Sequence, residues 1–293
     1  MSLFSPLPSL SSALSQVFPS KPAFTERDIP SLHSKVYIVT GSNTGLGKDI
    51  AQILYSKHAT VYIAARSPSR PKPPYLRPRP PGHENHLAAN CLGPFLFTKL
   101  LTPLLVSTAR AASNDSPDAA STARRDRDRV RVIWVSSSTA ELYGVRDTGV
   151  PLANLDYHAD GAVAPMARHG ISKAGSYLHA VEYARWCRAD GVVSLPLNPG
   201  NLRSELWRDQ SLLVKVMVRL FCYPTLYGAY TGLYAALTPG LGVEESGSRV
   251  VPFGGILPMR KDLVAAGKTE HEGGNGAALK FWEWSEKQAE AYV

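Results

Sequence analysis

The sequence is poor in features that would mark a secreted or membrane-inserted protein. Its 293 residues include only three cysteines, an odd number set in apolar surroundings. This excludes a disulfide framework and favours reduced, buried thiols in a cytoplasmic protein. The N-terminus has no basic start, and prolines interrupt its apolar run. It therefore predicts a loosely docked arm over residues 1–34 and not a signal peptide.

Long apolar runs are also lacking. The most apolar stretch, residues 211–237, is interrupted by Lys215, Arg219 and Pro224. This predicts two helices and no membrane span, and leaves open a surface lip that touches lipid. The formal net charge of +8 is spread along the chain, and no nucleic-acid-binding module is present. We therefore expect no nucleic-acid partner, whereas an anionic ligand fits the charge. We also expect no metal.

What is present is an alternation of apolar strands and amphipathic helices. A β-branched strand at 35–41, a glycine turn, a helix at 48–57 and a strand at 59–67 make one βαβ unit. The pattern predicts a Rossmann-type doubly wound parallel sheet in a single domain, residues 35–293. Later elements are expected as strands at 129–138, 191–200 and 248–253, and as helices at 83–109, after His169 and at 278–293. Pro196 fits its strand badly because it lacks a ladder donor.

Two segments interrupt this pattern and are predicted to be irregular. In residues 68–84, seven of the first fourteen positions are proline, which no helix or interior strand accommodates. Residues 107–129 are a low-complexity stretch of Ala, Ser, Arg and Asp, which predicts a polar loop.

A glycine-rich stretch, TGSNTGLG, lies between the first strand and the first helix of the domain. Gly41, Gly45 and Gly47 would let the backbone turn tightly and approach a pyrophosphate at the helix N-terminus. The alternative is a purely structural turn. Arg66 follows the second strand, where its guanidinium suits the 2′-phosphate of NADP. The alternative for Arg66 is a surface residue at the end of a strand.

His169 and Lys173 are four residues apart in ARHGISKAGSYLHAVEYARWC. On a helix they lie one turn apart on one face. A titratable imidazole beside an ammonium is an arrangement suited to acid–base chemistry. The alternative is a solvated first turn that carries two polar side chains on an amphipathic helix.

Five stretches, in this order, resemble the short-chain dehydrogenase/reductase family, and its fungal retinol-dehydrogenase-like members in particular. They are TGSNTGLG, AANCLGPFLFTKLL, VIWVSSSTAE, SKAG and NPGNLRSEL. The resemblance implies an NADP-dependent oxidoreductase that moves hydride between nicotinamide and a carbonyl or alcohol carbon of a small apolar molecule, in fungal secondary metabolism. Members of the family often form homodimers through the helix that here bears Lys173, and the sequence leaves the oligomeric state of this chain open.

The same resemblance assigns roles to single residues. Ser137, with Ser138 as the alternative, would orient the substrate carbonyl, and Asn90 would support a proton relay. Lys173 would lower the pKa of the proton donor and hold the nicotinamide ribose. The implied cofactor contacts are Gly41, Asn43, Gly45, Leu46, Gly47, Arg66, Asn90, Lys173, Leu202 and Ser204.

The chain departs from the family pattern at the proton donor. The family carries tyrosine four residues before the lysine, and this chain has His169. Beside cationic Lys173 and an oxidised nicotinamide, a neutral imidazole is favoured, and neutral imidazole is a very poor acid. We therefore expect turnover well below that of a tyrosine-bearing relative.

A second departure concerns the middle of the sheet. Only 23 residues separate Arg66 from Asn90, and the NNAG motif that ends a central strand of the family is absent. The strands on either side must pair directly or leave a gap. Three hypotheses follow: an active oxidoreductase, a catalytically weak relative that binds a nucleotide or a protein, and an inactive product of a mis-joined gene.

Overall fold

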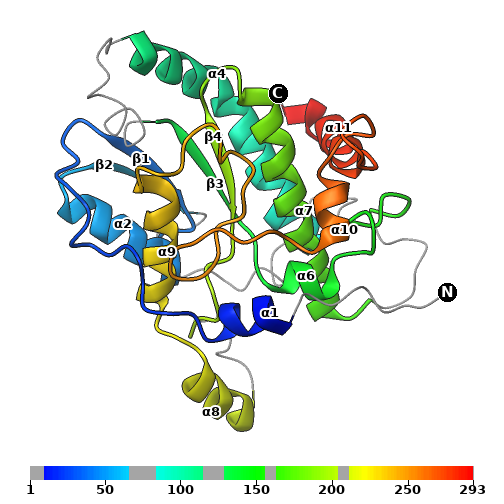
Figure 1. Cartoon of the computed structure of the whole chain (residues 1–293), viewed down its shortest axis with the longest axis horizontal. Coiled ribbons are helices and arrows are strands. Elements are labelled where there is room, and N and C mark those ends of the chain that lie inside the picture. The colour runs from blue at the N-terminus through cyan, green and yellow to red at the C-terminus, as the bar shows by residue number, and fades with distance from the viewer. Residues whose placement is uncertain (1–9, 66–83, 115–128, 156–162, 204–210, 293) are drawn as a thin grey trace.

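Four short parallel strands form two separate pairs. The computed structural model describes residues 10–65, 84–114, 129–155, 163–203 and 211–292. Strand β1 (Val36–Thr40) pairs with β2 (Thr60–Ala64), and β3 (Arg131–Val135) pairs with β4 (Val193–Leu197). Within these ranges the two pairs do not join into one sheet. Of the two outcomes expected from the short Arg66–Asn90 interval, direct pairing of the flanking strands or a gap, the described residues show the gap (Figure 1).

The helices that surround the two pairs range from 3 residues in α3 to 23 residues in α7, and they mostly follow the expected order. They are α1 Leu10–Val17, α2 Gly45–Ser56, α3 Asn85–Leu87, the π-helix η2 Ala88–Leu92, α4 Gly93–Asn114, α6 Thr139–Tyr143, α7 Pro165–Cys187, α8 Leu212–Phe221, α9 Thr225–Leu237, α10 Lys261–Ala266, α11 Ala277–Ala289 and the 3₁₀ turn η5 Glu290–Tyr292. The two helices expected within 211–237 are therefore confirmed as α8 and α9.

The prediction of an irregular segment over 107–129 is wrong in its first part. Helix α4 continues to Asn114 because alanines and other good helix formers extend its pattern, even with Pro103 inside. The rest of that segment, and residues 68–83, lie outside the described residues. The strand expected at 248–253 is also wrong, since only Val250 forms bridges, to Leu197 and to Ile256.

Pro196 proves compatible with β4 because of the direction in which its nitrogen faces. Val193 donates to Val130 and Ser136 donates to Leu197, so alternate residues of β4 bond to β3. Pro196 is out of phase with this set, and its carbonyl accepts from Val250 on the other edge. The missing N–H therefore removes no bond between β3 and β4.

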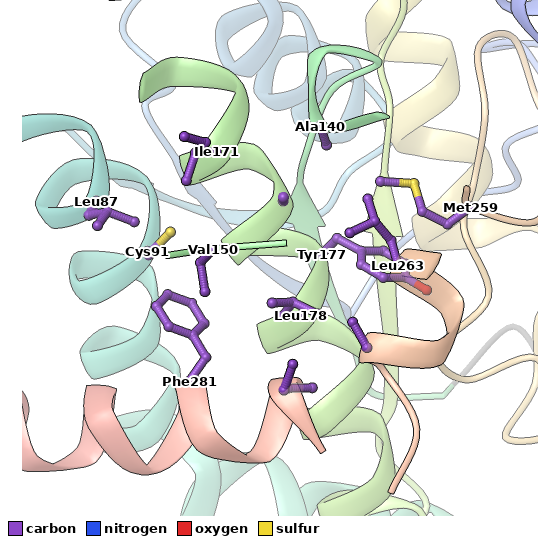
Figure 2. Close-up of a cluster of buried hydrophobic side chains, with 14 of the residues drawn as sticks. Leu87, Cys91, Ala140, Val150, Ile171, Tyr177, Leu178, Met259, Leu263 and Phe281 are labelled. Atoms are coloured by element: carbon purple, nitrogen blue, oxygen red, sulfur yellow. The ribbon is translucent and has the colours of Figure 1, made fainter. Parts of the chain in front are cut away.

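Helix α7 is the centre of the largest core cluster. Its residues Ile171, Tyr177 and Leu178 pack against α10, α11 and η2, with Phe281 and Cys91 among the contacts (Figure 2). From Gly170 to Ala184 nearly every residue is buried. The helix expected after His169 is present, but it begins earlier, at Pro165, and it is buried on most sides and not amphipathic. The alternative of a solvated first turn around His169 and Lys173 is wrong as well, because Gly170, Ile171 and Ser172 are buried.

The N-terminal arm is also more firmly packed than expected. Phe24, Ile29 and Leu32 are buried in a core cluster with residues of α2 and α9. A loosely docked arm is therefore the wrong description for residues 10–34, because large apolar side chains fix it to the domain.

Cysteine burial agrees only partly with expectation. Cys91 and Cys187 are free and buried, whereas Cys222 is free and half-buried.

Residues Asn85–Ala112 form one helical stretch long and apolar enough, by length and composition alone, to cross a membrane. Only 17% of this apolar window is buried, and Cys91 and Phe95 are among its residues that pack in the core. Pairing of two copies through α7 stays a prediction.

Candidate active site

The glycine turn connects β1 to α2 and leaves the start of the helix open. Gly41 and Gly45 have φ angles of 65° and 54°, which other residues rarely adopt. A Cβ at Gly47 would lie 2.7 Å from the carbonyl oxygen of Gly41, so only glycine fits. Thr44 at the N-cap makes no side-chain capping bond. The first N–H groups of α2 are thus available to an anion.

Leu46 and Leu202 lie close to the same glycine of α9. Both side chains lie against Gly228 of α9, where the absence of a side chain makes room for them. The structure therefore brings together a residue of the glycine turn and a residue of the expected nicotinamide loop. Asn43 is half-buried within the turn. Arg66 and Ser204 lie outside the described residues.

Lys173 lies beside the end of β3. Its ammonium donates to the carbonyl oxygen of Val135 at 2.9 Å, and its own carbonyl accepts from the Ser136 hydroxyl at 2.7 Å. Val135 is one of the residues whose backbone faces away from β4. The ammonium thus donates a hydrogen bond to the Val135 carbonyl, which would accept one from a neighbouring strand if a strand lay there. Burial lowers the pKa of Lys173 to about 8.

His169 is half-buried one turn before Lys173 on α7. Burial first, then the cation of Lys173 and the nearby His86, lowers the pKa of His169 to about 4. The His86 and His169 rings lie edge to face with centroids 6.2 Å apart. The imidazole is therefore neutral at neutral pH, which agrees with the expectation from the sequence.

Asn90 lies within the π-helix η2 and is tied to α7. Its amide donates to the Ser172 hydroxyl at 2.9 Å, and Ser172 donates to the carbonyl of His169 at 2.7 Å. The Asn90 carbonyl accepts from the Ser176 hydroxyl at 3.0 Å. π-Helical turns recur at functional sites because they reorient single side chains. Here the π-helical turn points the Asn90 side chain at Ser172, whose hydroxyl bonds to the backbone carbonyl of His169.

Ser137 and Ser138 both lie half-buried in the turn before α6. The Ser137 oxygen accepts from the backbone N–H of Thr139 at 3.2 Å, so its own proton is not used in that bond. Ser138 occupies the N-cap of α6 without a side-chain capping bond. Geometry alone does not choose between the two hydroxyls.

Two glycines of α7 allow the site elements to approach one another. A Cβ at Gly170 would lie 2.7 Å from the carbonyl oxygen of Thr139, and one at Gly175 would lie 2.8 Å from the Cys91 sulfur. The helix therefore contacts both the serine turn and η2 at van der Waals distance. This packing places Lys173, His169 and Asn90 within one cluster.

Sequence reasoning missed Ser136 and Ser172, whose hydroxyls connect the expected residues. The sequence pointed to these two serines only through their positions, because Ser136 precedes Ser137 and Ser172 precedes Lys173. The part of the chain that the structure describes contains no group of three His, Cys, Asp or Glu side chains able to hold a metal ion.

Comparison with known proteins finds relatives along nearly the whole chain. It is 37% identical over 351 residues to a short-chain dehydrogenase/reductase of Phomopsis amygdali, covering 99% of this chain and 100% of the relative. It is 35% identical over 342 residues to the short-chain dehydrogenase/reductase bet4 of Neocamarosporium betae, covering 97% and 94%. These alignments are longer than the 293 residues of this chain, so the relatives carry residues that it lacks. No family model matches.

Solved structures support the fold. A protein from Mycobacterium paratuberculosis aligns with a TM-score of 0.58 at 18% identity, covering 90% of this chain and 96% of that one. An NADPH-bound carbonyl reductase from chicken fatty liver aligns with a TM-score of 0.51 at 11% identity, covering 77% and 99%. At such identities the similarity establishes a Rossmann-type architecture and no more.

Proposed function

The chain belongs to the short-chain dehydrogenase/reductase family of oxidoreductases, and on that premise we propose an NADP-dependent reaction. Hydride moves between the nicotinamide and a carbonyl or alcohol carbon of a small apolar molecule, and the setting is fungal secondary metabolism. The fungal relatives support the setting, and the apolar segment 211–237 supports the substrate class.

One observation carries the proposal: the environment of Lys173. A lysine with a pKa of about 8, one turn from a titratable side chain and next to a serine turn, is uncommon in a purely structural role. Its neighbours His169 and Asn90 complete a set of polar groups at the carboxyl end of β3. Parallel α/β sheets bind their ligands at that end.

The residues present fit a dinucleotide. The open N-terminus of α2 would bind the pyrophosphate, and Leu46 and Leu202, which both lie against Gly228, would contact the cofactor together. Arg66, two residues after the end of β2 in the sequence, would pair with a 2′-phosphate. When bound, the cofactor supplies or accepts the hydride.

The side chains of the chain handle the proton and the substrate oxygen. The Ser137 hydroxyl is free to donate to a carbonyl oxygen, and the Lys173 ammonium adds positive charge nearby. His169 donates through a neutral N–H, which stabilises a developing alkoxide by hydrogen bonding but transfers its proton poorly. Asn90 fixes the backbone of His169 through Ser172.

A nucleotide-binding protein with little turnover is the second candidate. Two observations favour it: the low pKa of His169, and the bond that holds the Lys173 ammonium on the Val135 carbonyl. An inactive product is the third, favoured by the split sheet.

Titration of NADPH by fluorescence, followed by an assay of hydride transfer to a panel of aldehydes and ketones, separates the three. We expect NADPH to bind more tightly than NADH. We expect Gly47→Ala to abolish binding, because its Cβ would meet the Gly41 backbone. Gly240→Ala is the matched control, since nothing lies within 4 Å of a Cβ there.

The outcomes are distinct. Binding with turnover supports the oxidoreductase, binding without turnover supports the second candidate, and no binding by the wild-type protein refutes the proposed cofactor. Equal binding by the Gly47 variant and the wild-type protein would show that the glycine turn is not the cofactor site.

A further inference from the structure

Gln16, on the N-terminal helix α1, is 5% exposed and makes hydrogen bonds in two directions. Its amide nitrogen donates to Oε2 of Glu141 at 3.1 Å, and its amide oxygen accepts from Nδ2 of Asn198 at 2.9 Å. Both partners are also buried. One side chain of the arm thus connects two elements that are distant in sequence. Figure 1 shows α1 below the carboxyl ends of β3 and β4, between α6 and α9.

Asn198 controls the start of the expected nicotinamide loop. It directly follows β4, and its side-chain oxygen accepts from the backbone N–H of Gly200 at 3.1 Å. Gly200 has a φ of 97°, and a Cβ there would lie 3.2 Å from Pro252. The path of the loop toward Leu202 therefore depends on how the Asn198 amide is held.

Glu141 holds the amide nitrogen of Gln16. It belongs to α6, the short helix that follows Ser137 and Ser138. Its carboxylate is 2.9 Å from Arg249, and both side chains of this ion pair are at most 3% exposed. Gln16 is thus anchored on a rigid, buried pair and reaches from it to Asn198.

We propose that Gln16 is a positioning residue for the cofactor loop, residues 198–203, and that α1 supports the proposed active site through this side chain. The Gln16 amide oxygen holds the Asn198 side chain in the orientation in which it accepts the bond from Gly200 N–H. The loop then follows the path that places Leu202 beside the cofactor. The effect on cofactor binding rests on the proposed function. The effect on the loop does not.

Three variants test the proposal. Gln16→Met keeps the length of the side chain but removes the bonds that Gln16 makes to Asn198 and to Glu141. Gln16→Glu keeps an acceptor for Asn198, with Arg249 offsetting part of the added charge. Ser15→Ala changes an exposed neighbour on α1 and is the matched control. Calorimetric titration with NADP⁺ should show a loss on the order of tenfold or more for Met, a smaller loss for Glu, and none for the control.

Hydrogen exchange of the protein without cofactor provides the second readout. Peptides that cover residues 198–203 should exchange faster in Gln16→Met than in the wild-type protein, while peptides from α7 stay unchanged. If Gln16→Met does not fold, the comparison of Gln16→Glu with Ser15→Ala decides. Unchanged exchange in the loop overturns the proposal. If the wild-type protein binds no NADP⁺, the proposed function fails, and the exchange data still decide the role of Gln16.

Discussion

At the scale of single residues, His169 is the group proposed to handle the proton in the candidate site. Its pKa of about 4 results mainly from burial and then from Lys173. The same cation that would lower the pKa of a phenol, and so assist it, suppresses protonation of an imidazole. With histidine in place of the family's tyrosine at position 169, the charge of Lys173 therefore hinders protonation of the expected proton donor.

Replacement of His169 by tyrosine should raise the rate of carbonyl reduction. The phenol regains reach toward the substrate oxygen, and Lys173 favours its ionisation, so a gain on the order of 10² is expected. The measurement is the loss of NADPH absorbance with a small panel of aldehydes and ketones.

His169→Phe is the control, because it supplies a ring without a proton and should be no faster than the wild-type protein. If the tyrosine variant binds NADPH but shows no gain, the missing segment and not the proton donor limits the activity.

A second histidine, His179, is completely buried on α7 and bonds to Ser285 at 2.9 Å. Ser285 donates its own proton to the Phe281 carbonyl, so Nε2 of His179 is the donor and Nδ1 has no partner. Burial lowers the pKa of His179 to about 3. Protonation of this side chain is therefore strongly disfavoured in the folded state.

Stability should fall on acidification through His179. The unfolded chain takes up this proton near pH 6.5 and the folded chain only near pH 3, so between these values the unfolded state binds more protons. The loss from pH 7 to pH 5 is about 2 kcal/mol. His179→Phe should remove this part of the loss, measured as the free energy of urea unfolding at both pH values. The same pH dependence in both proteins would contradict the assignment.

At the scale of elements, the separation of the two strand pairs leaves open edges. Lys35 accepts from Thr60, and Gly41 donates to Ala64, so alternate residues of β1 bond to β2. Val36 and Ile38 are out of phase, and their backbone groups face away from β2. Their side chains are 59% and 41% exposed. An apolar edge of this kind promotes association between chains.

Val36→Lys should therefore reduce self-association. A charge on an open edge disfavours pairing with another strand. Light scattering during incubation at raised protein concentration measures the effect. Tyr55→Lys is the control, because Tyr55 is 74% exposed and belongs to helix α2 and not to a strand. An equal reduction in both variants would show that net charge, and not the edge, is responsible.

At the scale of the whole molecule, helix α9 holds the two halves together. Its residue Leu233 is buried with α2 and the N-terminal arm, and Ala235 is buried with residues of β4. Tyr234 packs against both clusters. The halves therefore share a core although their sheets do not pair. Relatives of greater length carry additional residues, which accords with a segment that this chain lacks.

Much of the fold could be predicted from the sequence because its signals are local. The β-branched runs, the glycine turn and the two helices of 211–237 follow from the side chains themselves. The predictions failed where contacts between residues far apart in the sequence determine the structure. Helix α7 is enclosed by η2, α10 and α11. Phe24 and Ile29 pack the N-terminal arm, which its composition predicted to be loosely docked, against the domain.

The sequence by itself determined the family, the order of the site residues and the absence of the tyrosine, because each is a matter of residue type and spacing. Only the tertiary structure decided that the strand pairs stay apart, that Lys173 binds the Val135 carbonyl, and that Gln16 connects Glu141 with Asn198. These are contacts between residues far apart in the chain. They depend on how whole elements pack, and no local pattern specifies that packing.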